Sequence, residues 1–278
     1  IKKALIHLIL IAGIGVTILP FFWMITTAFK TQGESVQMPP IWFPSAWRLD
    51  AFKEVLAKPN FLMVYKNTII TTVVTVLGQV GLCAMAGYGF ARIHFPGRDI
   101  LFVLILGVLM IPPQIFLMPQ YLIIQNMGLL NTIPALFLPN LFSAFGTFLL
   151  RQSFLSLPKE LEEAAKIDGC GSVSTFVRIM LPNAKSSILT VFLFSLVWHW
   201  NEYTLTKTFF PQKFQPLAVQ LKLAIEAMIN DIVLRLDLSF QMGVTYASVL
   251  LFILPVLIIY IFTQRWFVEG VESSGIKG

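Results

Sequence analysis

The residues with the most distinctive chemistry lie in a polar stretch between positions 151 and 186, which separates two long apolar segments. Within it, Glu162 and Glu163 are followed directly by Ala164 and Ala165. Carboxylates can pair with arginines across an interface, and small alanine side chains let a partner backbone approach closely. These residue types therefore indicate a docking surface and not a catalytic centre.

The polar stretch is predicted to contain two short helices. Residues 159–167 are mostly strong helix formers, and Pro158 suits the first helical position. Gly169 stands where a helix needs a left-handed residue to end it. Four residues are expected on one face of this first helix: Leu161, Ala164, Ala165 and Asp168.

The second short helix is expected to begin near Ser172, a suitable N-cap, and to end at Pro182. Its apolar residues recur at helical spacing: Val173, Phe176, Val177 and Met180. A competing interpretation makes the whole stretch an amphipathic loop that lies on lipid headgroups. Its glutamates would then face anionic lipid, whereas interfacial helices prefer lysine and arginine on their polar side.

The elements around this stretch are those of an all-α membrane protein. The chain has 278 residues, of which 56 % are hydrophobic and 12 % are charged, and its mean hydropathy is +0.78. Soluble domains carry about 25 % charged residues. The net charge of +6 needs no nucleic acid to explain it, because the basic residues form no cluster.

Charge-free windows predict six transmembrane helices in a single domain, since a bilayer core of about 30 Å takes about 20 apolar residues. The window from Ile100 to Leu150 is too long for one span, and turn-prone residues at 125–128 and 131 divide it. The predicted spans are 4–29, 67–91, 100–124, 132–150, 186–206 and 241–264. The polar stretch then forms a loop at 151–185, and two longer loops occupy 30–66 and 207–240. Within the longer loops, residues 50–57 and 218–229 have helical character.

Basic residues near helix ends predict the orientation of the spans. With the N-terminus inside, Lys2, Lys3 and Arg92 face the cytoplasm, together with the 151–185 loop and the tail at 265–278. Both termini are therefore expected to be cytoplasmic. The first apolar window is expected to be a retained helix, because it is too long for the apolar region of a signal peptide.

Catalytic and metal-binding constellations are not found in the sequence. Cys83 and Cys170 stand apart and give neither a metal spacing nor a plausible disulfide. The three histidines have no ligand-spaced partners, and Gly270–Lys277 lacks the glycine-lysine-Ser/Thr string of a phosphate loop. The chain is therefore expected to be no enzyme and to bind no metal or cofactor itself.

Two of the predicted spans combine prolines with polar residues. The third has a proline pair at 112–113 with Gln114 and Gln120, and the fourth has Pro139 beside Asn140. Proline in a spanning helix frees carbonyls that neighbouring groups or water must satisfy. Such helices often line a path, but the same kinks occur as ordinary structure, and both interpretations stay open.

The polar stretch resembles a known motif. Its string Glu163-Ala164-Ala165-x-x-Asp168-Gly169, nine further residues and Ile179-x-Leu181-Pro182 match without a gap the EAA loop of bacterial ABC importer permeases. Other segments are similar to the carbohydrate branch of that family, in particular to the second permease of maltose-type systems. These segments are Asn67-Thr68, Tyr88–Arg92, Gly128–Thr132, Trp200–Tyr203 and Gln264–Gly270. The resemblance covers nearly the whole chain.

This resemblance implies a type I ABC importer permease in the bacterial inner membrane, with a cytoplasmic EAA coupling helix. The chain would form half of the path and pair with a second permease subunit as a heterodimer. Two ATPase subunits would bind ATP and Mg, and an extracytoplasmic solute-binding protein would deliver the substrate. ATP-driven closure of the ATPases would move the coupling helix and rock the spans. The residues carried over to the docking patch are Glu162, Glu163, Ala164, Ala165, Asp168 and Gly169.

The resemblance also implies a sugar as the substrate, with an oligosaccharide favoured and glycerol phosphate or a monosaccharide left open. Saccharides present hydroxyls and apolar ring faces, so aromatic side chains beside amides or carboxylates suit them. The candidate path residues are Trp198, Trp200, Asn201, Glu202, Tyr203, Gln114, Gln120, Asn140 and Ser143. Interfacial anchoring and hydrogen bonds between helices would explain the same residues. The loop at 209–216 is a candidate contact for the binding protein.

The alternative to an importer subunit is a self-contained, ion-coupled secondary transporter. Such a carrier needs an acidic group or an ion site within the membrane, and Glu202 is the one acidic residue within the predicted spans. An intramembrane enzyme is a third class, but the sequence has no paired acids, metal ligands or Ser/His arrangement for it.

Overall fold

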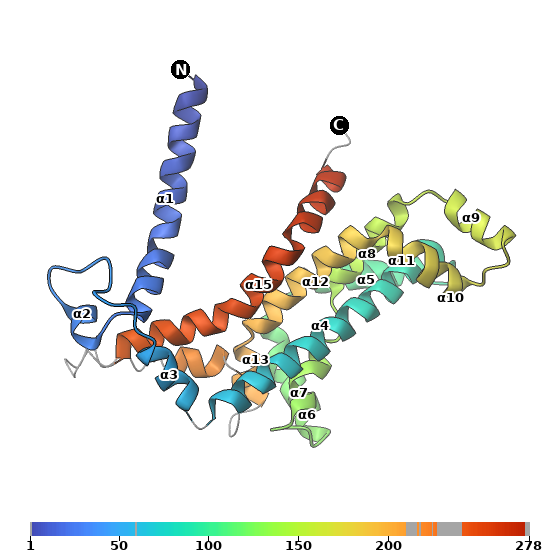
Figure 1. Ribbon diagram of the computed structural model, residues 1–278. Coiled ribbons are helices and arrows are strands. Elements are labelled where there is room, and N and C mark those ends of the chain that lie inside the picture. The colour runs from blue at the N-terminus through green and yellow to red at the C-terminus, as the bar shows by residue number, and fades with distance from the viewer. Residues whose placement is uncertain are drawn as a thin grey trace. The chain divides into compact units, whose positions relative to one another are not determined.

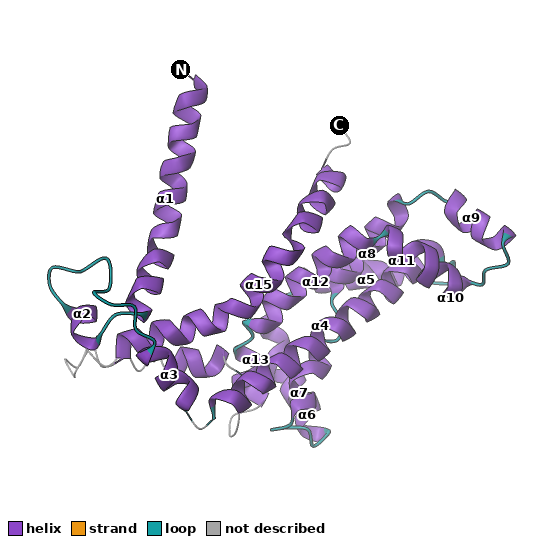
Figure 2. Ribbon diagram, in the orientation of Figure 1, coloured by secondary structure: helices purple, strands orange, loops and turns teal. Residues whose placement is uncertain are grey.

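The computed structural model describes residues 2–58, 60–209 and 241–275, together with 216, 218–223 and 225–226. Every regular element in these residues is a helix (Figure 2). Contacts divide the chain into two compact units, residues 1–65 with 216–255 and residues 66–215 with 256–278. The predicted all-α class is therefore confirmed.

The first unit contains long apolar helices and two short polar ones. Its elements are α1 (Lys2–Ala28), α2 (Gln32–Val36), α3 (Asp50–Ala57) and the N-terminal parts of α4 (Phe61–Arg92) and α15 (Gln241–Gly275). The bounds of α3 are those predicted. Ala28, Val55 and Ala247 are almost fully buried together, so α1, α3 and α15 share one apolar core.

A capping box fixes the start of α2. The Thr31 hydroxyl accepts the N–H of Glu34, and the Glu34 carboxylate accepts the N–H of Thr31 at 2.8 Å. The same carboxylate accepts the N–H of Ser45 at 2.9 Å. Hydrogen bonds from the Ser45 side chain and from the backbone of Thr31 and Ser45 stabilise the charged form and lower the pKa of Glu34 to about 2. Glu34 therefore ties two parts of this loop together.

The second unit consists of helices that are repeatedly interrupted (Figure 1). Besides the remainders of α4 and α15, it contains α5 (Arg98–Val108), the 3-10 helix η1 (Pro113–Phe116), α6 (Leu117–Asn126), α7 (Ile133–Phe137), the 3-10 helix η2 (Leu138–Asn140), α8 (Ala144–Ser156), α9 (Glu160–Ile167), α10 (Ser172–Thr175), the π-helix η3 (Phe176–Met180), α11 (Leu181–Asn183), α12 (Lys185–Trp200) and α13 (Thr204–Phe209). Its core includes Leu150, Phe154 and Met180, all with fully buried side chains.

The close packing of α4 against α8 depends on a missing side chain. A Cβ at Gly87 would lie 3.0 Å from both the backbone nitrogen of Arg151 and the Cβ of Leu150. The two backbones can approach this closely because Gly87 has no side chain, which is the usual function of small residues between membrane helices.

Three helices are long and apolar enough to span a bilayer by themselves: Leu5–Ala28 in α1, Phe61–Arg92 in α4 and Met242–Gln264 in α15. Three further pairs pass the same test only together, with bends of 100°, 44° and 79° between their halves. The described residues thus hold three to six candidate spans. The predicted number of six is reached if each bent pair counts as one span.

The third predicted span, 100–124, is not a continuous helix. The chain bends by 100° between α5 and the segment Pro113–Asn126. Pro112 and Pro113 have no N–H to donate, so the hydrogen-bond ladder of α5 cannot run through them. The Ile111 N–H, which bonds the Val108 carbonyl at 3.2 Å, is the last donor before the break. The turn that follows α6 contains Gly128 and Asn131, both with positive φ, where the sequence predicted a division.

The fourth predicted span, 132–150, is broken between Asn140 and Ala144 and continues to Ser156. Side chains of α4 satisfy backbone carbonyls that this break leaves open. The Gln79 Nε2 donates to the Asn140 carbonyl at 2.6 Å, and the Cys83 thiol donates to the Ser143 carbonyl at 3.3 Å. A broken helix within a bilayer requires such replacement partners.

Within the fifth predicted span, 186–206, the helix is interrupted near its end. Helix α12 stops at Trp200, and a new helix, α13, starts at Thr204. The Glu202 Oε1 accepts the N–H of Leu205 at 2.9 Å, so the carboxylate caps the new helix and does not continue the old one. Most of the predicted 207–240 loop, including positions 210–215 and 227–229, lies outside the described residues.

Candidate functional site

Helix α9 has a complete C-terminal cap. The Cys170 N–H bonds the Ala165 carbonyl at 2.8 Å, and the Gly169 N–H bonds the Lys166 carbonyl at 3.1 Å. With Gly169 at φ +77°, these bonds form a Schellman motif. The prediction that Gly169 ends the helix in a left-handed conformation is confirmed. The N-terminal prediction is wrong, because the helix begins at Glu160, two residues after Pro158.

The predicted face of α9 is divided between the interior and the surface of the chain. Ala165 is 1 % exposed, and Leu161 and Glu162 are half-buried. Ala164 and Asp168 were expected on the same face, but both are exposed. The outward surface of this helix and its cap therefore consists of the following residues: Glu163, Ala164, Lys166, Ile167, Asp168 and Gly169.

The second short helix contains a π-helical turn. Gly171 is the N-cap and Ser172 the first helical residue, one position from the prediction. Pro182 does not end the helix, because Leu181–Asn183 is still helical. The Leu181 N–H bonds the Phe176 carbonyl, and this wider turn lets the chain accommodate a proline that cannot donate.

Two exposed apolar side chains flank the α9 cap. Ile167 is 87 % exposed and Val173 is 77 % exposed, whereas Phe176 and Met180 of the second helix pack into the core. Val173 and Met180 were expected on the same apolar face, so their separation was not predicted. Both side chains lie outside the predicted spans, so lipid is not expected to cover them.

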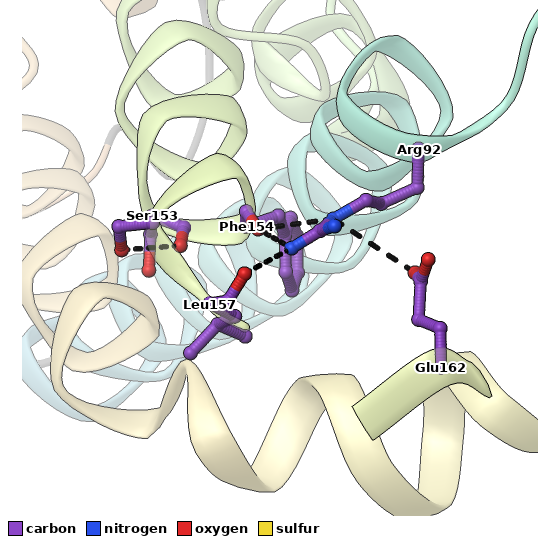
Figure 3. A network of polar contacts seen from close by, with 6 residues as sticks. Arg92, Ser153, Phe154, Leu157 and Glu162 are labelled. Atoms are coloured by element: carbon purple, nitrogen blue, oxygen red, sulfur yellow. Dashed lines mark hydrogen bonds and ion pairs between the residues drawn. The ribbon is translucent and has the colours of Figure 1, made fainter. Parts of the chain in front are cut away.

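Glu162 faces the interior of its own chain. Its Oε1 lies 3.9 Å from the Nε of Arg92, and the side chains of Glu162 and Arg92 are 16 % and 7 % exposed (Figure 3). The Arg92 guanidinium also donates to the carbonyls of Phe154 and Leu157, at the C-terminal end of α8. Glu162 was expected to present its carboxylate to a partner arginine, but it lies beside an arginine of this chain.

A cavity of about 450 Å³ lies beside the break between η2 and α8. Three of the predicted path residues line it: Asn140, Ser143 and Trp198. Aromatic rings of Phe116, Phe142, Phe145 and Phe194 line it as well. The lining also includes Gln79, Ser195 and His199, which the sequence interpretation missed. Gln79 could have been identified from the sequence, because it is a glutamine inside the apolar window 67–91.

The other predicted path residues do not line this cavity. Gln114 is exposed on η1 and Gln120 half-buried on α6. Trp200 is 5 % exposed at the end of α12. Asn201 donates to the Val197 carbonyl, and Glu202 caps α13, so these polar side chains stabilise local backbone. Tyr203 lies under the ammonium of Lys207 at 5.4 Å.

Comparisons with known proteins bear on these features. Residues 79–272 match the family model described as "Binding-protein-dependent transport system inner membrane component". That match starts at Gln79 and includes both the cavity and α9. The chain belongs to this family. It is 32 % identical to Protein LplC of Bacillus subtilis (strain 168) over 98 % of this chain and 94 % of that protein.

Two further likenesses agree with this membership of the ABC permease family. The chain is 30 % identical to the diacetylchitobiose uptake system permease protein NgcG of Streptomyces coelicolor, over 98 % of this chain and 88 % of that protein. Its fold matches a chain of a bacterial ABC transporter involved in the import of the acidic polysaccharide alginate, with a TM-score of 0.84, 22 % identity and 96 % of each chain covered.

Membership of the family settles the coarse function. The chain is a multi-pass inner-membrane permease subunit of a binding-protein-dependent ABC importer and not an enzyme. The family's name implies a binding protein, and an ABC system implies an ATPase. A self-contained ion-coupled carrier, the alternative left open by the sequence, does not agree with this membership.

Proposed function

We propose that this chain forms half of the path of a saccharide importer and receives the force of ATP hydrolysis through α9. A second permease subunit would complete the path, two ATPase subunits would hold ATP and Mg, and an extracytoplasmic binding protein would deliver the sugar. The exposed surface of α9 is the observation that carries the proposal. It combines the carboxylates of Glu163 and Asp168 with the apolar side chain of Ile167.

The docking patch offers an ATPase subunit two kinds of contact. Carboxylates at Glu163 and Asp168 suit arginines of the partner, with which they can form charge-assisted hydrogen bonds. Ile167 and Val173 suit an apolar pocket, since full burial of such a side chain contributes about 1.5–3 kcal/mol. Exposed Ala164 lets the partner backbone come close. Glu162 and Ala165 were expected in the patch, but both face the inner side of α9 and are left out of it.

The proposed topology has one span for each bent helix pair, with residues 172–183 of the third pair kept on the cytoplasmic side, which gives six spans with both termini in the cytoplasm. Basic residues support this orientation, because Arg92, Arg98 and the α9 region then lie on the cytoplasmic side. The bends of 100°, 44° and 79° fall at or near prolines or the Asn140–Ser143 break. Helices broken in this way are tolerated where the backbone is buried in protein or lines a water-filled cavity.

The proposed substrate is an oligosaccharide. Two of the similar proteins carry saccharides in their names, diacetylchitobiose and alginate. The 450 Å³ cavity is lined by Trp198, Phe142 and Phe194 beside Asn140 and Ser143. Ring faces next to hydroxyl and amide groups suit a pyranose, which presents both apolar faces and hydroxyls.

Reconstitution of the assembled transporter in proteoliposomes tests the proposal. With binding protein outside and ATP with Mg inside, uptake of a labelled oligosaccharide is expected to require ATP and to be insensitive to ionophores. Ile167→Ser and Val173→Ser are expected to weaken binding of the ATPase subunit, while the matched change Val36→Ser, on α2, leaves it unchanged. Val36 is exposed like the other two but lies in the first unit.

Two results would contradict the proposal. Uptake driven by an ion gradient without ATP would show that the chain works as a carrier. Unchanged ATPase binding in Ile167→Ser, Val173→Ser and Glu163→Lys together would show that the docking surface lies elsewhere than α9.

A further inference from the structure

We propose that Arg92 is the positioning residue that holds α9 to the transmembrane helices, so that a displacement of α9 is passed on to α4 and α8. The inference rests on the proposed function of α9 as the helix that the ATPase moves. The inference is based on the contacts of one guanidinium. Arg92 belongs to α4, donates hydrogen bonds to the end of α8 and pairs with Glu162 of α9 (Figure 3).

The first half of the contact caps α8. The Arg92 Nε and Nη2 lie 3.2 and 2.7 Å from the Phe154 carbonyl oxygen, and Nη2 lies 2.5 Å from that of Leu157. These carbonyls lie where a helix leaves acceptors without intrahelical partners. A cation there also complements the negative end of the helix dipole. Nη2 reaches both carbonyls and Nε adds a second donor to Phe154, a two-nitrogen geometry that a lysine ammonium does not have.

The second half of the contact points to α9. Glu162 lies in the first turn of α9, and its carboxylate is placed beside the side chains of Arg92 and Tyr88, both on α4. The 3.9 Å separation from the Arg92 Nε is an ion pair but too long for a hydrogen bond. A shift of about 1 Å would convert it into a charge-assisted hydrogen bond. The pair therefore pulls α9 toward α4.

Apolar packing holds α9 itself only weakly. Ala165 is its one fully buried residue. The neighbouring aromatic cluster is made by Tyr88, Phe154 and Phe176, which belong to α4, α8 and the π-helix. A helix that buries so little apolar surface depends on its polar contacts to keep its position. The Arg92–Glu162 pair is the ion pair between α9 and the rest of the described unit.

Arg151 provides a matched control for the hydrogen bonds between Arg92 and the end of α8. Its Nε donates to the Phe90 carbonyl near the end of α4 at 3.3 Å, and its guanidinium lies 4.0 Å from the Phe102 ring centre. Arg151 thus joins α4 to α8 as Arg92 does, but no contact of its side chain with α9 is found among the described residues. Arg151→Gln removes a cap between the same two helices and leaves Glu162 in place.

Hydrogen exchange of the permease in lipid nanodiscs tests the positioning directly. In Glu162→Gln and in Arg92→Gln, the amides of residues 160–167 are expected to exchange about tenfold faster than in the unchanged protein. Arg151→Gln is expected to leave these amides unchanged, and Arg92→Lys, which keeps the charge, to recover part of the protection. Glu162→Gln keeps every α8 cap, so it answers the question even if Arg92→Gln folds poorly.

The consequence for coupling can be tested by measuring how much ATP is hydrolysed for each sugar imported. Glu162→Gln and Arg92→Gln are each expected to raise this ratio about tenfold with the ATPase still bound, and the double variant to have less than the combined effect of the two single variants, since they share the Arg92–Glu162 contact. Equal effects of Arg151→Gln and Arg92→Gln, or an unchanged Glu162→Gln, would overturn the positioning role. If the exchange pattern appears but the unchanged protein imports no sugar with ATP, the proposed function fails and the positioning stands.

Discussion

The left-handed residue at the end of α9 gives the sharpest test of the docking surface. Gly169 has φ +77°, and a side chain added there would meet nothing within 4 Å. Replacing it with serine therefore introduces backbone strain and no steric clash. An L-residue in this conformation costs roughly 1–2 kcal/mol.

The chain can relieve that strain only by opening the cap. Opening breaks the bond from the Cys170 N–H to the Ala165 carbonyl and moves Asp168 away from its place beside Ile167. A cost of about 1–2 kcal/mol lowers the ratio of the capped to the opened form by a factor of about 5–30. Because docking is proposed to need the capped form, the affinity for the ATPase subunit is expected to fall by up to the same factor.

Binding of the purified ATPase subunit to the permease pair in nanodiscs measures this loss. Gly171→Ser is the control, since Gly171 has φ −74° and ψ 166° at the N-cap of α10, where serine is favoured. It too has open space around its Cβ position. Gly169→Asn is expected to bind better than Gly169→Ser, because asparagine tolerates positive φ. Equal binding by Gly169→Ser and Gly171→Ser would refute the argument.

Three further expectations can be checked independently. Glu163→Lys reverses an exposed charge of the patch and is expected to abolish ATP-driven uptake without changing the amount of protein in the membrane; normal uptake would remove Glu163 from the patch. Gln79→Leu leaves the Asn140 carbonyl without its partner and is expected to lower stability by about 1–3 kcal/mol in thermal unfolding, unlike Gln125→Leu on the exposed face of α6. The folded pKa of Glu34 lies below its unfolded value of 4.5, so its carboxylate stabilises the first unit above pH 4.5, and this contribution is lost as the pH falls toward 2. Glu34→Gln is expected to remove that pH dependence from unfolding curves. Curves unchanged by the substitution would contradict the assignment.

Features encoded by a few adjacent residues were predictable from the sequence. The bounds of α3, the turn at Gly128 and the cap at Gly169 all follow from local propensity and from the need for positive φ. Such signals depend little on the rest of the fold. The positions of the apolar windows were predictable for a similar reason, because span length is set by the thickness of the bilayer.

The orientation of α9 was not predictable in the same way. Its sequence places Leu161, Ala164, Ala165 and Asp168 at helical spacing, and nothing local decides which edge of that arc is buried. In the structure Glu162 lies beside Arg92, seventy residues earlier, and Leu161 and Ala165 face inward on the same side of the helix. A pairing over that distance cannot be inferred from the periodicity of an eight-residue helix.

At the break in the fourth span, the functions of polar residues also depend on partners far away in the sequence, so they could not be inferred from local sequence alone. Gln79 accepts a hydrogen bond from the Ser195 hydroxyl and donates one to the Asn140 carbonyl, both at 2.6 Å. The Ser143 hydroxyl oxygen accepts the Gly146 N–H, and the Asn140 amide donates to the Leu136 carbonyl. The main function of these side chains is therefore to form hydrogen bonds with backbone groups around the break. The surface that the cavity would offer the proposed sugar is then mainly apolar, with five Phe and Trp rings. Substitutions of Trp198 are expected to separate sugar contact from backbone support better than substitutions of Asn140.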